Sequence, residues 1–134
     1  MGSNLIKEGD SMESQIKIVY DFVKEFPEFE VKLIDHINFN EEVLPHVFFG
    51  DEVNPVLLDS LIYNKNSEKL RDLFTFFEER MCNSSEPYVK NVLTTTILAR
   101  IGDERIALKN AFQFAGPGVL NLMIEIERYL ERNH

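Results

Sequence analysis

The sequence has 134 residues and a mass of 15.6 kDa, which suits one domain with a single hydrophobic core. Eleven Phe and four Tyr residues exclude a disordered acidic tail, and no apolar run is long enough to span a membrane. The formal net charge of −9 makes binding to nucleic acid or to an anionic membrane surface unfavourable.

The negative charge is concentrated in one part of the chain. Ten acidic residues lie between positions 21 and 59, where only Lys24 and Lys32 oppose them. No Lys or Arg occurs over 33–64, whereas acids and bases nearly balance in the rest of the chain. An even spread would indicate solubility alone, but this asymmetry indicates a cationic partner.

The N-terminal segment and the cysteine content both bear on where the protein resides. Residues 1–11 show little periodicity, and we interpret them as a flexible arm or as residues added before a natural start at Met12. Cys82 is the only cysteine, so no intramolecular disulfide can form, and no signal-peptide pattern opens the chain. We therefore expect a protein of the reducing cytoplasm.

In the first half of the chain, apolar spacing predicts a helix over 12–26, which Pro27 ends. Residues 28–38 fit a strand or a helix, and we choose a helix because a lone strand would lack a partner. Asn40 followed by two acids resembles an N-cap and first turn. Pro45 then limits the next helix to a short or kinked one that ends near Gly50.

The remaining boundaries are set mostly by Pro and Gly. Asn54 and Pro55 indicate the start of a mostly apolar, central helix that reaches Tyr63. Further apolar stripes predict helices over 70–81, 89–101, 106–114 and 117–130. The chain is therefore expected to be all-α, with a single domain over 12–134. Six to eight short amphipathic helices would form a bundle or a stacked array of helix pairs.

Few motifs indicate chemistry. The histidines lack the spacing that places two metal ligands on one helix face, and no nucleophile motif surrounds Cys82 or any serine. Gly116-Pro117-Gly118 lacks the lysine of a phosphate loop, so we interpret it as a helix end and a helix start. Thr96 falls on the same side as Leu93 and Ile97, and its hydroxyl can bond back to a carbonyl one turn earlier, so we assign the run 94–96 to packing. We expect no cofactor, no metal and no enzymatic activity.

The region around Phe48 and Phe49 combines aromatic and acidic residues. We expect one of the two rings to face the core and the other to be partly exposed. An exposed ring bounded by carboxylates would suit a basic partner, and a core ring beside a solvated loop fits the pattern equally well. The candidate partner-binding residues are Asp35, Glu41, Glu42, His46, Phe49, Asp51, Glu52 and Asp59.

Two groups of residues carry a family resemblance. Leu44-Pro45-His46 with Phe49-Gly50-Asp51, and the stretches 91–93 and 99–103, resemble an uncharacterised family of small helical bacterial proteins. Members of that kind are similar to immunity proteins encoded beside polymorphic or contact-dependent growth-inhibition toxins. The resemblance would cover residues 12–130 and supplies no catalytic residues.

The resemblance implies a binder that occludes the active site of a toxin. A nuclease toxin attracts a polyanion and so presents a basic cleft, which matches the acidic stretch found here. The sequence thus predicts a monomeric immunity protein that forms a 1:1 complex with the basic C-terminal domain of a toxin. The alternatives are a helical scaffold or regulatory module with another partner, a small-molecule-binding protein, and an enzyme.

Overall fold

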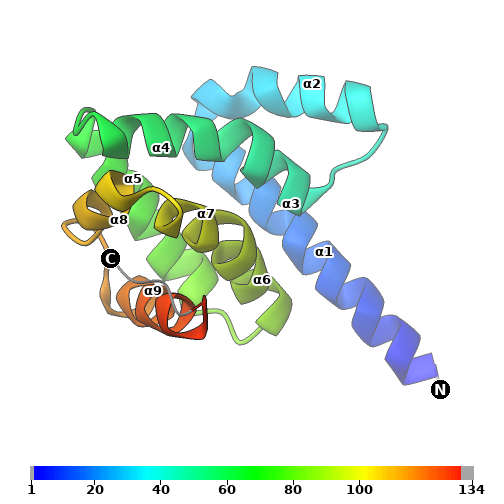
Figure 1. Ribbon diagram of the computed structural model, residues 1–134. Helices are drawn as coiled ribbons and strands as arrows, with labels where there is room; N and C mark the ends of the chain where they lie inside the picture. Colours follow the sequence, from blue (N-terminus) through cyan, green and yellow to red (C-terminus); the bar gives the residue numbers. More distant parts are fainter. Residues whose placement is uncertain (1, 131–134) are drawn as a thin grey trace.

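The computed structural model describes the backbone of residues 2–130 and the side chains of residues 13–130. Every regular element in this part of the chain is a helix, which confirms the predicted all-α class (Figure 1). No helix among the described residues has the length and apolar character needed to cross a membrane.

The elements follow one another with short connections. In chain order they are α1 (Gly2–Glu25), the 3₁₀ turn η1 (Pro27–Phe29), α2 (Glu30–Asn40), α3 (Pro45–Phe48), the π-helical segment η2 (Phe49–Val53), α4 (Asn54–Ile62), α5 (Ser67–Phe76), the π-helical segment η3 (Phe77–Cys82), α6 (Pro87–Asn91), the π-helical segment η4 (Val92–Leu98), α7 (Ala99–Gly102), α8 (Arg105–Ala111) and α9 (Pro117–Leu130). Because the π-helical segments continue the flanking α-helices, residues 2–130 form seven helices, within the range predicted.

The helices pack around a core that α1 crosses. Helix α1 contacts α3 and α6, α4 lies against α8, and α9 packs against η3, η4 and α7. Helix α2 lies at the edge of the molecule, above α1 and beside α3 (Figure 1). The segment 28–38 is therefore helical, as we chose from the sequence, and it forms most of η1 and α2.

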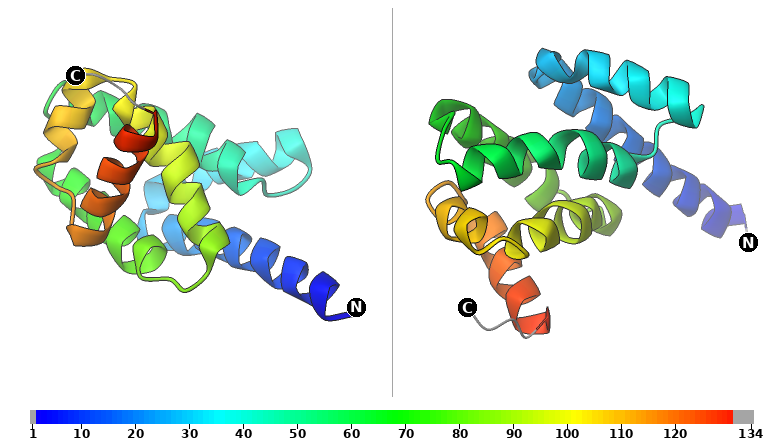
Figure 2. Two further views of the ribbon diagram at one scale, coloured as in Figure 1. Left: turned by 60° about the horizontal axis from the view of Figure 1, so that its bottom comes forward. Right: turned by 45° about the horizontal axis from the view of Figure 1, so that its top comes forward.

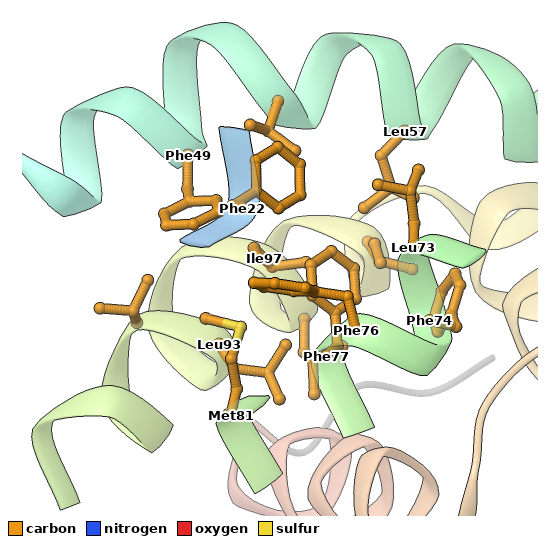
Figure 3. Close-up of a cluster of buried hydrophobic side chains, with 14 of the residues drawn as sticks. Phe22, Phe49, Leu57, Leu73, Phe74, Phe76, Phe77, Met81, Leu93 and Ile97 are labelled. Atoms are coloured by element: carbon orange, nitrogen blue, oxygen red, sulfur yellow. The ribbon is translucent and has the colours of Figure 1, made fainter. Parts of the chain in front are cut away.

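Phe22 lies at the centre of an aromatic cluster in this core (Figure 3). Its ring centroid is 4.9 Å from that of Phe26 and 5.3 Å from those of Phe49 and Phe76, the last two in edge-to-face geometry. Edge-to-face pairs place the positive rim of one ring on the negative face of another. One side chain of α1 thus joins the helices that begin at Pro45 and Ser67.

The helix that begins at Pro45 differs from the sequence-based expectation. It does not end near Gly50, and Asn54 is not an N-cap; the chain continues as one helix from Pro45 to Ile62. A proline inside an α-helix removes a backbone donor and collides with the preceding turn. Segment η2 lies immediately before Pro55 and accommodates it, with the Asn54 N–H donating to the carbonyl of Phe49 five residues earlier.

The predicted helix start at Asn40 is also wrong. Asn40 is the last residue of α2, and its side-chain Nδ2 donates to the carbonyl of His36 at 2.9 Å. Glu41 follows in the left-handed region with φ of 65°, where its N–H bonds the carbonyl of Ile37 and ends the helix. Glu41 and Glu42 therefore lie in the loop before α3, not in the first turn of a helix.

From the sequence, we interpret residues 1–11 as a flexible arm or as residues added before a natural start at Met12. The backbone of α1 begins at Gly2, so most of this segment continues the helix toward the N-terminus. Met1 lies outside the described residues. That these residues differ in origin from the rest of the chain stays a prediction.

The start of α9 is capped by a side chain from another helix. Both Glu78 carboxylate oxygens accept backbone N–H groups, from Gly118 at 2.8 Å and from Val119 at 2.9 Å. A carboxylate is favourable there because the first N–H groups of a helix lack partners and carry partial positive charge. A Cβ atom at Gly116 would lie 2.7 Å from Glu78 Oε1, so the glycine leaves room for the carboxylate.

This cap predicts coupled effects on stability. Glu78→Ala should lower the free energy of unfolding by about 1–2 kcal/mol, because two N–H groups lose a charged acceptor. Gly116→Ala should also destabilise the protein, but much less so when Glu78 is already alanine. Chemical denaturation of the two single variants and the double variant measures this coupling. If Gly116→Ala lowered the free energy of unfolding equally in the wild type and in the Glu78→Ala variant, the role of the carboxylate would be contradicted. Glu79→Ala, a change at a neighbouring exposed acid, is the matched control.

Cys82 should be a slow nucleophile in the folded protein. Burial raises the pKa of its thiol from 9.0 to about 12, and the Glu78 carboxylate adds to this rise. Alkylation by iodoacetamide at pH 8 should therefore be at least about tenfold slower than in the urea-unfolded chain, since the thiolate is the reactive form.

The same pKa difference affects stability. Because the Cys82 thiol of the unfolded chain ionises at lower pH than that of the folded chain, the free energy of unfolding should fall as the pH rises from about 9 towards 12. Mass spectrometry and denaturation curves measure the two effects, and Cys82→Ser should lack the second.

Candidate partner-binding face

Three of the candidate acids meet at an open cleft between α2 and the helix that begins at Pro45. The cleft has a volume of about 350 Å³, and Asp35, Asp51 and Glu52 contribute carboxylates to its lining. Asp35 comes from α2, whereas Asp51 and Glu52 come from η2. The fold thus brings Asp35 to the same cleft as two acids that follow it sixteen and seventeen positions later in the sequence.

The aromatic residue at this cleft is Phe39. Its side chain is 87% exposed and lines the cleft beside the three carboxylates. Phe48 and Phe49 are both 0% exposed, so the expectation that one of them is partly exposed is wrong. Phe49 packs edge-on against Phe22 and cannot serve as a surface anchor. The pattern of an aromatic ring among acids is present, but a different phenylalanine supplies the ring.

The sequence contained a signal for Phe39 that our predicted helix boundary missed. Helix α2 runs to Asn40, two residues beyond the predicted end at residue 38. At about 100° per residue, Phe39 lies about 120° around this helix from the buried Leu33. A helical projection extended by two residues would have placed Phe39 away from the core.

The carboxylates on this face differ in whether a cation accompanies them. Among the described residues, no cation forms an ion pair with Asp35, Glu41, Glu42 or Asp51. Glu52 lies 3.9 Å from Lys32 Nζ, a loose pair. Four uncompensated negative charges within one region repel one another and produce a negative field that a cationic partner would relieve.

Asp59 does not belong to the same group. It lies on α4, and its carboxylate is 2.7 Å from Lys65 Nζ. It lines none of the clefts described here. The structure therefore gives Asp59 a local partner and places it apart from the cleft.

His36 holds the loop that carries Glu41 and Glu42. Its ring is buried, and Nε2 accepts the backbone N–H of Leu44 at 3.0 Å. Since Nε2 is an acceptor, this nitrogen carries no proton. The bond joins the last turns of α2 to the residue just before Pro45, so it fixes the path of residues 41–44.

His46 lies in α3 and lines a second cleft, which has a volume of about 540 Å³. Its Nδ1 shares a hydrogen bond of 2.6 Å with Thr96 Oγ1. The Thr96 hydroxyl bonds the His46 ring and not a carbonyl one turn earlier, whereas the Thr95 hydroxyl donates to the carbonyl of Asn91. Asp51 and Arg100 also line this cleft, so Asp51 borders both clefts.

Asn54, the residue that directly follows η2, links this segment to the π-helical segment η4. Its side chain is 1% exposed, and Nδ2 donates to the carbonyl of Thr96 at 2.7 Å. The Oδ1 atom of the same amide is buried and has no hydrogen-bond partner. Single π-helical turns are frequent at functional sites, and here two of them face each other across these polar groups.

The described residues contain no group of three or more His, Cys, Asp or Glu side chains that could hold a metal ion. The acids of the first cleft form a negatively charged surface. What the arrangement can do chemically is attract and orient positive charge around one exposed aromatic ring.

Comparisons with known proteins give one match. No curated protein and no solved structure matches the chain. One family model matches residues 20–131, a range that contains both clefts and every candidate residue discussed above. The chain therefore belongs to the family described as "Domain of unknown function (DUF7674)".

Proposed function

We propose that this protein is an immunity protein that binds a basic, nuclease-type toxin domain and occludes its active site. The observation that carries the proposal is a set of exposed carboxylates at Asp35, Glu41, Glu42 and Asp51, with which no cation among the described residues forms an ion pair. Asp35 and Asp51 line one cleft together with the exposed ring of Phe39, and Glu41 and Glu42 follow in the loop after α2. A surface of this kind combines long-range attraction with a short-range apolar anchor.

The electrostatic part of the proposal concerns the rate of association. A nuclease must attract a polyanion, so its cleft is expected to be basic and complementary to this face. Complementary charges raise association rate constants to about 10⁸ M⁻¹s⁻¹ or more at low salt. Fast association suits an immunity protein, which has to occupy the toxin before nucleic acid is cut. The proposed place of action is the cytoplasm, where nucleic acid would be the target.

The proposal requires no chemistry from this chain. A monomer that covers the toxin's cleft in a 1:1 complex would inhibit it by exclusion of the substrate. The resemblance to immunity proteins supports this reading, and a nuclease toxin domain encoded by a neighbouring gene would be the partner to test. A scaffold or regulatory module would use the same face for another basic protein, and it would leave a neighbouring nuclease active.

Charge reversal on this face should slow association with the toxin. Changing Asp35, Glu41, Glu42 and Asp51 to Lys shifts the formal net charge from −9 to −1 and alters only exposed positions. We expect association at least about tenfold slower at low salt, and a weaker dependence of the rate on salt. Stopped-flow mixing with the toxin domain measures both, and circular dichroism checks the fold.

The matched control carries four acid-to-Lys changes at other exposed positions, namely Glu13, Glu68, Asp72 and Glu79. It has the same net charge of −1, since it changes the same number of acids. Association as slow as that of the first variant would mean that total charge acts alone and that the face is not a site. Unimpaired cleavage of nucleic acid in the presence of excess wild-type protein would refute the immunity function itself.

Truncation of the exposed ring should affect the complex differently. Phe39→Ala removes an apolar anchor that contributes little to the core, so we expect a loss of about 2 kcal/mol in binding, mostly as faster dissociation. The free energy of unfolding should change by less than about 0.5 kcal/mol. Tyr63→Ala, a change at another exposed ring, is the control. Equal dissociation rates for the two variants would show that Phe39 is not an anchor.

A further inference from the structure

A third cleft extends the face described above. It has a volume of about 310 Å³ and lies between η4 and α9, with Ile126, Tyr129 and Leu130 in its lining. It shares Thr95, Ala99 and Leu130 with the cleft at His46. That cleft in turn shares Val47 and Asp51 with the cleft at Phe39. The three clefts therefore adjoin in a row, which we call the cleft row.

The arrangement of helices explains why the row is continuous. In the right-hand view of Figure 2, α2, the helix from α3 to α4, the helix from α6 to α7, and α9 follow one another from top to bottom. Each cleft lies over the junction between two successive helices of this series. Val47 and Asp51 are one helical turn apart and form the wall between the first two clefts.

The row is acidic along its length and apolar at both ends. Five acids line it, namely Asp35, Asp51, Glu52, Asp103 and Glu125. Among its described lining residues, Arg100 is the one Lys or Arg. Phe39 stands at one end with 87% of its side chain exposed, and Tyr129 at the other with 86%. Exposed rings of this size at the ends of a charged trough are typical of places where a partner inserts apolar side chains.

We infer that the cleft row is the docking surface for one continuous cationic segment of the toxin. This inference rests on the proposed function and adds a footprint to it. Lys or Arg side chains of the segment lie over Asp51 and its neighbours, and apolar side chains pack beside Phe39 and Tyr129. The footprint thus includes η4 and α9, which lie outside the acidic stretch that the sequence indicated.

A second copy of this chain is the competing occupant. Helix α8 and the residue that follows it present the exposed side chains of Ile106 and Phe112 beside Arg105 and Lys109, a basic and apolar patch of its own. The net charge of −9 on each copy opposes such self-association, which is why the observations favour a cationic partner.

The test uses variants in the half of the row that is far from the acidic stretch. Thr95→Lys combined with Tyr129→Ala places a positive charge in the row and removes the terminal ring. We expect the dissociation constant for a cognate toxin domain, sought in the neighbouring gene, to rise at least about tenfold, measured by calorimetry. The control combines Thr75→Lys with Tyr63→Ala, the same chemical changes at exposed positions outside the row, and should bind like the wild type.

Hydrogen exchange of the complex provides a second readout that separates the possible failures. Protection of α2, η2, η4 and α9 together supports the inference. Protection limited to residues 35–52, with normal binding by the Thr95/Tyr129 variant, would overturn the inference and leave the immunity function intact. Absence of any complex with the toxin domain would overturn both. Concentration-dependent dimers of the free protein that Lys109→Glu abolishes would assign the row to a second copy and overturn the inference.

Discussion

A helix that passes through Pro55 needs a wider turn before the proline, and this requirement shapes both the interior and the surface of the protein. The π-helical turn η2 supplies it between Phe49 and Val53. The turn keeps the helix unbroken from Pro45 to Ile62, so that Phe48 and Phe49 both enter the core. Asp51, in the middle of the same turn, stays at the surface, where it borders two clefts. The core packing around Phe22 and the position of Asp51 on the acidic face therefore both depend on the π-helical turn η2.

The sequence predicted the class of the fold and most of the helices because both follow from apolar spacing. The stripe from Leu70 to Met81 and the stripe from Val89 to Ile101 are buried along their length, as expected. The errors are at Asn40, Gly50 and Asn54, whose residue types favour helix ends. At these positions tertiary packing outweighed the local preference for a helix end. The π-helical turns that keep the helix continuous have no sequence signature from which they could have been predicted. The tripeptide Gly-Asp-Glu illustrates the point, since it lies within a helix at 50–52 and at a helix end at 102–104.

The candidate site was predictable in its charge and not in its geometry. Charge is a property of composition, so the gap without Lys or Arg was visible in the sequence. Which acids share a cleft depends on how α2 packs beside η2, and that packing set Asp59 apart. The links from His46 and Asn54 to Thr96 depend on contacts between positions more than forty residues apart. No local pattern contains such information.

The carboxylate of Glu78 at the start of α9 has a consequence for how related sequences can differ. Its two bonds to backbone N–H groups and the close approach of Gly116 and Gly118 form one steric and electrostatic unit, although forty positions separate its parts. A side chain at 116 fits only if position 78 has become shorter, and a shorter residue at 78 leaves α9 without its acceptor. A Cβ atom at 118 would also lie 2.9 Å from the Cβ atom of Cys82, so Gly118 is needed whatever stands at 78. Substitutions at 78 and 116 should therefore occur together in the family, with a Ser, Thr, Asp or Asn near 116 taking over the cap wherever Glu78 is lost.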